Sequence, residues 1–166
     1  MSTLRNREIA AKMLEFRDKL WSEYNADDYW ERKGQRGFII MPRTMPLILQ
    51  IMDALAKGKP VSRTYLDVWC RTHNESVVKL DKPKQMAFYS GFSGQRGEQA
   101  WKDRMRTLHK LGFINIKPGS EGLGFAVVLN PHKVIAKHRA KRTPGFPENI
   151  YSVLLERGTE IKAKDL

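Results

Sequence analysis

Residues 94–130 read GQRGEQAWKDRMRTLHKLGFINIKPGSEGLGFAVVLN, and this stretch decides the fold. Its first half predicts a helix over residues 94–111. At about 100° per residue, Trp101, Met105 and Leu108 fall within a narrow arc that forms the buried face. Such a helix packs its apolar stripe against a hydrophobic core and leaves the opposite face to solvent or to a ligand.

The second half of the stretch predicts a β-hairpin. Apolar and polar residues alternate from Phe113 to Lys117, as in a half-buried strand, and a second apolar run covers residues 125–129. The connection, residues 118–122, is rich in glycine and polar residues and forms the tip. Lys117 stands at the base of the tip, within reach of a phosphate or a minor groove. Glu121 within the tip would repel phosphate.

The outer face of the 94–111 helix carries residue types that read DNA. Arginine can form two hydrogen bonds with guanine and glutamine two with adenine, whereas lysine more often meets phosphate. Asp103 on the same face would accept from cytosine or pair with a basic neighbour. The alternative is an ordinary solvated helix surface, which favours the same residues. The candidate DNA-binding residues of this segment are Gln95, Arg96, Gln99, Lys102, Arg106 and Lys110.

Two shorter helices are expected upstream. Thr44 is a suitable N-cap for a helix over residues 45–57, and Ser62 for one over residues 62–72. The following segment, residues 75–92, contains two strand-like runs separated by Lys-Pro-Lys and therefore predicts an inserted hairpin or loop. The alternative is that the 62–72 helix does not belong to the motif formed with the 94–111 helix.

In the order of these elements the chain resembles the winged-helix superfamily of DNA-binding proteins. The resemblance covers residues 44–130 and is one of pattern, without a specific signature. It implies a small three-helix domain whose third helix and wing face nucleic acid. The expected fold class is therefore α+β and mostly helical, with a winged helix-turn-helix core, an insertion at residues 75–92 and flanking N- and C-terminal helices.

The two ends of the chain are expected to be helical. Residues 5–25 predict an amphipathic helix that packs either on its own domain or on a partner subunit, and residues 147–157 predict a last helix. A short apolar run at residues 38–41 predicts a strand. The apolar stripe of the first helix consists of Ile9, Met13, Phe16, Leu20 and Tyr24. The expected domains are an N-terminal helical arm (1–36), a winged-helix domain (37–130), and a basic helix or linker with a C-terminal helix (131–166).

The net charge of +12 is concentrated in the middle of the chain and just after the hairpin. A concentrated basic surface steers association with a polyanion, although a well-solvated basic protein is the alternative. Asn130 and Pro131 predict the start of a helix that carries much of this charge. Residues 131–145 hold the densest basic run, which is either a phosphate contact or a solvated linker. Its candidate DNA-binding residues are Lys133, Lys137, Arg139, Lys141 and Arg142.

The sequence offers little for catalysis or metal binding. The single cysteine, Cys70, cannot form an intrachain disulfide, and the four histidines show no zinc-like spacing. No phosphate-binding nucleotide loop and no cluster of nuclease-like carboxylates is found outside the N-terminal arm. We therefore expect neither an enzyme nor a metal or cofactor. We also expect a cytoplasmic location, because no apolar run approaches a membrane span.

These patterns favour a double-stranded DNA-binding protein, a transcriptional regulator that acts as a homodimer through its N-terminal or C-terminal helices. A bacterial, phage or plasmid context is expected. Three alternatives remain open at the level of sequence: a plasmid or phage replication or partition protein, an RNA-binding protein, and a protein-interaction module whose basic face meets an acidic partner.

Overall fold

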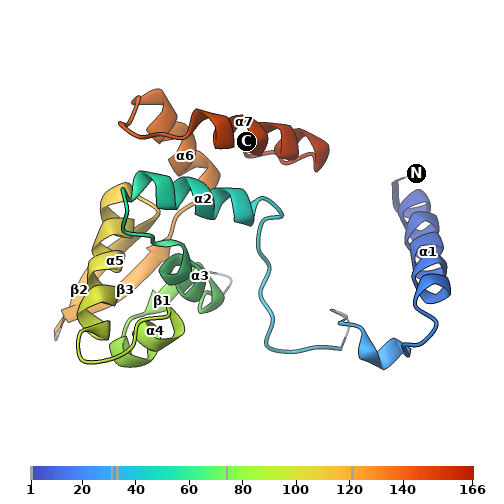
Figure 1. The fold of residues 1–166 in the computed structure, drawn as a ribbon, viewed down its shortest axis with the longest axis horizontal. Helices are drawn as coiled ribbons and strands as arrows, with labels where there is room; N and C mark the ends of the chain where they lie inside the picture. The colour runs from blue at the N-terminus through green and yellow to red at the C-terminus, as the bar shows by residue number, and fades with distance from the viewer. Residues whose placement is uncertain (1, 31, 33, 74, 121) are drawn as a thin grey trace. The chain divides into compact units, whose positions relative to one another are not determined.

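Helices make up most of the chain, and a small antiparallel sheet completes an α+β fold (Figure 1). The computed structural model describes residues 2–30, 32, 34–73, 75–120 and 122–166. The chain divides into two units, Met1–Phe38 and Ile39–Leu166. Residues 131–166 thus belong to the same unit as residues 39–130.

The first unit contains one long helix and a short turn of 3-10 helix. Helix α1 spans Ser2–Leu20, and the 3-10 turn spans Ala26–Asp28. The helix expected over residues 5–25 therefore ends earlier, at Leu20, and the Asp28 carboxylate accepts a hydrogen bond from the backbone N–H of Asn25 at 2.8 Å. The predicted apolar stripe of α1 is exposed along its whole length: its members Ile9, Met13, Phe16 and Leu20 are each at least half exposed.

The second unit has one hydrophobic core. Its helices are α2 (Met45–Leu55), α3 (Ser62–Cys70), α4 (Pro83–Tyr89), α5 (Gly97–Leu111), α6 (Pro131–Ala140) and α7 (Glu148–Glu160). Helix α2 contributes an apolar face with Ile48, Ile51 and Met52 fully buried. It contacts α3, α6 and α7, so the C-terminal helix packs on its own chain.

The sheet contains three strands, β1 (Val77–Lys79), β2 (Ile114–Gly119) and β3 (Gly122–Val128). Strand β3 lies in the centre and pairs antiparallel with both neighbours. One face of the sheet is buried through residues such as Val78, Ile114 and Ala126. Helix α5 runs beside β2 (Figure 1). The hairpin that the sequence predicts is therefore confirmed, and a third strand far away in sequence extends it.

Helix α5 is the predicted 94–111 helix, and it begins at Gly97. Its apolar stripe is buried as expected, with Trp101, Met105 and Leu108 each 0 % exposed. The helix ends at Gly112, whose φ of 83° is a left-handed conformation that a side chain disfavours. The chain then turns directly into Phe113, which is fully buried.

The inserted hairpin expected at residues 75–92 is confirmed only in its first half: the first strand-like run is a strand, but the second is a helix. This segment contains β1 and α4, and both contribute to the core through Val78, Met86 and Ala87. The run that looked like a second strand is helical because Pro83 occupies the first turn of a helix, where its missing N–H costs nothing. The Lys-Pro-Lys segment, which the sequence suggested as a break between two strands, is therefore the start of helix α4.

Two smaller expectations also need correction. Residues 38–41 form no strand; the carbonyl of Ile40 instead accepts a hydrogen bond from the Trp69 indole at 3.1 Å. Ser62 is the first residue of α3 and does not cap it by its side chain. The carboxylate of Asp53, at the end of α2, accepts the backbone N–H groups of Val61 and Ser62 at 2.7 and 2.9 Å. A residue of the preceding helix thus supplies the cap.

A buried histidine ties the C-terminal tail to the core. His132 is 4 % exposed; its Nδ1 donates to the carboxylate of Asp165 at 2.9 Å, and its Nε2 bonds the buried Thr44 hydroxyl at 2.7 Å. The hydrogen bond from His132 lowers the pKa of Asp165, helped by a second bond from Asn130. Three segments, the start of α2, the start of α6 and the tail, therefore meet at one side chain.

We expect acid to loosen the tail. Because the folded-state pKa of Asp165 lies below its ordinary value of about 3.9, the stabilisation is complete above that value and is lost as the pH falls through the lowered pKa. Amide exchange at Ala163, whose N–H bonds the Gly158 carbonyl, reports the change between pH 5 and pH 2. Asp165→Ala should show the loosened tail already at pH 5. Equal protection of this amide in both proteins would contradict the tether.

Candidate nucleic-acid interface

The outer face of α5 is a polar stripe fixed in position by the buried face opposite. Gln99, Asp103, Arg106 and Lys110 are exposed along it, and Lys102 is half-buried at its edge. The predicted residues Gln95 and Arg96 are exposed as well, but they precede the helix in the turn between α4 and α5. The structure thus brings four of the six predicted residues of this segment onto one helix face.

Asp103 organises the centre of this stripe. Its Oδ1 atom accepts hydrogen bonds from the Gln99 amide at 3.0 Å and from the Arg106 guanidinium at 2.8 Å. Lys102 pairs with Glu98 at 2.6 Å. Because Gln99, Asp103 and Arg106 are exposed, each of the two bonds to Asp103 contributes at most about 1 kcal/mol, and a ligand can replace it. Asp103 therefore holds the two base-reading candidates in place without sequestering them.

The hairpin presents Lys117 next to an irregularity in its register. Lys117 is exposed, and the pairing of β2 with β3 shifts between Lys117 and Pro118. Beyond this point Gly119 and Gly124 approach so closely that a Cβ atom on Gly124 would lie 2.7 Å from the Gly119 nitrogen. Both glycines are thus required by the tight crossing near the tip. Glu121 lies outside the described residues.

The basic run after the hairpin separates into two groups in the structure. Lys133, Lys137 and Lys141 follow one another at intervals of four residues and line one pocket. Arg139 instead bonds Glu148 of its own chain at 3.2 Å and lies 4.7 Å from the centre of the Tyr151 ring. Arg142 is exposed in the turn after α6 with a φ of 50°. The three lysines are the coherent part of the predicted run.

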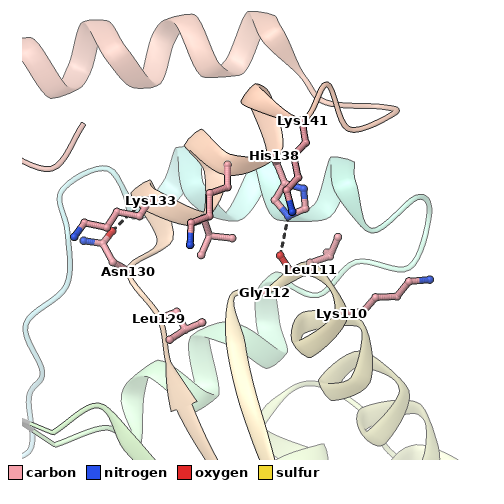
Figure 2. A pocket seen from close by; sticks show the side chains of 10 residues that line it. Lys110, Leu111, Gly112, Leu129, Asn130, Lys133, His138 and Lys141 are labelled. Carbon is pink, nitrogen blue, oxygen red and sulfur yellow. Dashed lines mark hydrogen bonds between the residues drawn. The ribbon is translucent and has the colours of Figure 1, made fainter.

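These lysines and the end of α5 surround what we term the lysine pocket, a half-open cavity of about 430 Å³ (Figure 2). Lys110 and Lys133 lie on opposite sides of the view in Figure 2, with Leu129 and Gly112 between them. The described lining contains no carboxylate. It consists of Lys110, Leu111, Gly112, Leu129, Asn130, Lys133, Val134, Lys137, His138 and Lys141. Lys110 thus belongs to both the α5 stripe and the pocket.

His138 fixes the geometry of the lysine pocket. Its Nε2 donates to the carbonyl oxygen of Leu111 at 2.7 Å, one of the carbonyls that the end of α5 leaves without a helical partner. Its Nδ1 bonds the Thr143 hydroxyl at 3.0 Å, and its ring stacks on Phe113. Helix α6 is therefore fastened to the end of α5, which keeps the lysines of the two helices around one cavity.

Sequence reasoning missed the role of His138 and the meeting of Lys110 with the lysines of α6. A signal for half of the pocket was present, because Lys133, Lys137 and Lys141 share one helix face at a spacing of four. No local pattern pointed to the partner helix. The contact joins residues 27 positions apart in the chain.

Comparisons with protein families, with curated proteins and with solved structures found no match for this chain. Among the described residues, no three side chains of histidine, cysteine, aspartate or glutamate are grouped so that they could hold a metal ion. In the same part of the chain, no helix combines the length and apolarity needed to cross a membrane.

Proposed function

We propose that the chain is a double-stranded DNA-binding protein of winged-helix type that acts as a transcriptional regulator. Helix α5 enters a major groove, the β2–β3 hairpin serves as the wing, and the lysine pocket holds the sugar–phosphate backbone. The observation that carries the proposal is the pairing of a polar, arginine- and glutamine-bearing helix face with a carboxylate-free basic pocket that shares Lys110 with it.

The corrected order of elements supports the winged-helix proposal better than the sequence alone. Helices α3, α4 and α5 supply three core helices, and α4 and α5 form the pair joined by a turn at residues 90–96. The hairpin follows α5 directly, and β1 completes its sheet from the segment before α4. Because the former insertion is part of the core, no extra element interrupts the pattern.

A polyanionic partner also agrees with the distribution of charge. The outer face of α5 and the lysine pocket together hold six basic side chains: Lys102, Arg106, Lys110, Lys133, Lys137 and Lys141. Among the described residues, Asp103 and Glu98 are the only carboxylates that pair with them. Contacts from lysine and arginine to phosphate supply most non-specific affinity for DNA and release bound counterions. Contacts to base edges from the stripe would add the specificity.

We further propose that copies of the chain pair through α1, because its apolar stripe is exposed within its own unit. Helix α7 is a weaker candidate for pairing, since Leu154 and Tyr151 are buried against the core of their own chain. A homodimer would present two α5 helices to two half-sites, as palindromic operators require.

Two substitutions separate base reading from phosphate contact. Arg106→Ala should cost about 1–3 kcal/mol on the specific site and relax discrimination there, because it removes a contact to a base edge. Lys137→Ala should weaken binding to all duplexes similarly and lower the salt slope by about one, because it removes one phosphate contact. Fluorescence anisotropy with specific and random duplexes, at several salt concentrations, measures both.

The control is Lys59→Ala, an exposed lysine outside the stripe and the pocket, which should leave specificity unchanged. If Arg106→Ala and Lys137→Ala lose the same affinity on specific and on random DNA, α5 does not read bases. If no variant or wild-type protein binds duplex DNA at low salt, the proposed function is wrong.

A further inference from the structure

We propose that the lysine pocket also binds a free compact polyphosphate, such as a nucleoside triphosphate, and that this ligand competes with the DNA backbone. The binding itself is independent of DNA; the competition rests on the proposed function. Such a ligand would make the affinity for DNA depend on the concentration of a small metabolite.

The charge of the lysine pocket exceeds what a DNA strand can neutralise there. Four lysines line the pocket, and its volume corresponds to roughly 7–8 Å across. Successive phosphates of one DNA strand rise about 3.4 Å along the helix axis and lie farther apart than that in space, because the strand winds around the axis, so at most about two fit within that width. Two of the four positive charges then remain without a partner. A triphosphate concentrates three to four negative charges in the same space.

The lysines of the pocket repel one another, and such a ligand would neutralise their charge. Lys133 and Lys137 on α6 and Lys141 at its C-cap follow one another at spacings of four, an arrangement in which like charges repel. No carboxylate in the described lining compensates them. Their exposed, flexible side chains can reorient around a small anion, and each ammonium offers three donors.

The floor of the lysine pocket favours a ligand with an uncharged part. Leu111, Leu129 and Val134 line it, and Leu129 is 39 % exposed although it is a large apolar residue. A sugar or base could cover this side chain while the phosphates meet the lysines at the rim. Inorganic phosphate and tripolyphosphate have no such part and would leave Leu129 uncovered.

The frame of the pocket is rigid enough to be a site in the free protein. His138 fastens α6 to the end of α5 by its bond to the Leu111 carbonyl (Figure 2). Its ring also stacks on Phe113. The side chain of Asn130 caps the other end of α6, accepting the N–H groups of His132 and Lys133 at 3.0 and 3.3 Å. Only the lysine side chains need to move when a ligand binds.

Isothermal titration calorimetry of the full chain without DNA tests the site, with ATP, tripolyphosphate and inorganic phosphate as probes. We expect one ATP per chain, tripolyphosphate binding more weakly than ATP, and inorganic phosphate binding at least about tenfold more weakly than either. Lys133→Ala/Lys137→Ala should weaken ATP binding at least about tenfold. The matched control Lys59→Ala/Lys84→Ala, which removes two exposed lysines outside the pocket, should not.

Several results would overturn the site: equal ATP affinity in the pocket variant and the control, or equal affinity for ATP and inorganic phosphate. Circular dichroism of the pocket variant verifies that it is folded.

A second experiment tests the competition by measuring duplex binding with and without saturating ATP. We expect ATP to weaken DNA binding by the wild-type protein and to have little effect on the pocket variant. Unchanged DNA affinity with ATP bound would disprove the competition, whereas absence of DNA binding would disprove the proposed function and leave the calorimetric result standing.

Discussion

Trp101→Ala is expected to lower the free energy of unfolding by about 3–5 kcal/mol, the range for truncating a large buried aromatic side chain. Trp101 is 0 % exposed and lies on the inner face of α5, between that helix and the rest of the core. Since a domain of this kind is stable by only about 5–15 kcal/mol, this one change would remove a large share of its stability. Urea denaturation followed by far-ultraviolet circular dichroism measures the loss.

Trp101→Phe is the matched control. It keeps an aromatic ring in the core and removes the indole Nε1, which has no hydrogen-bond partner among the described residues. Its destabilisation should therefore be clearly smaller than that of Trp101→Ala, because the cavity is smaller and an unsatisfied buried donor disappears. A loss below about 1 kcal/mol for Trp101→Ala would mean that the inner face of α5 is not packed as described.

The second large effect concerns the lysine pocket. Lys133→Ala/Lys137→Ala/Lys141→Ala should reduce the dependence of duplex affinity on salt by about two contacts, because about two phosphates fit the pocket. Each contact contributes about 0.9 to the slope of log affinity against log salt concentration, so two contacts change the affinity about 60-fold for each tenfold change in salt. If the two proteins bind alike near 1 M salt, the variant should bind about 60-fold more weakly at 0.1 M, and the loss should shrink as salt rises. Anisotropy titrations between 50 and 400 mM salt give the slopes.

The triple variant should lose affinity for specific and random duplexes alike, because phosphates carry no sequence information. Lys59→Ala again serves as the control with an unchanged slope. A triple variant whose slope equals that of the wild-type protein would show that the backbone does not enter the lysine pocket, whatever its overall affinity.

Local patterns sufficed for much of the fold. The spacing of Trp101, Met105 and Leu108 predicted α5 and its buried face. Alternation predicted the first strand of the hairpin, and an apolar run predicted the second. Asn130 and Pro131 predicted the start of α6, where the Asn130 side chain accepts two backbone N–H groups. In each case the signal lies within a few residues of the structure that it predicts.

Local patterns did not suffice where a helix is rich in aromatic residues or where the partners lie far apart in the chain. Phe88 and Tyr89 gave residues 85–92 the look of a strand, but the segment is the helix that Pro83 begins. The bond between Thr44 and His132 joins positions 88 residues apart, and no periodicity encodes it. The lysine pocket could not be predicted for the same reason. Its lysines were recognised as candidates in the sequence, but only the contact of His138 with the end of α5 brings them together.

Selection of bound sequences from random duplex DNA at near-physiological salt tests the central claim, that the outer face of α5 reads base pairs. We expect an enriched motif for the wild-type protein, palindromic if copies pair as proposed. We also expect Arg106→Ala to select a motif with reduced preference at one position and Lys137→Ala to select the same motif as the wild type. A wild-type selection without enrichment, or an Arg106→Ala motif identical to that of the wild type, would contradict it.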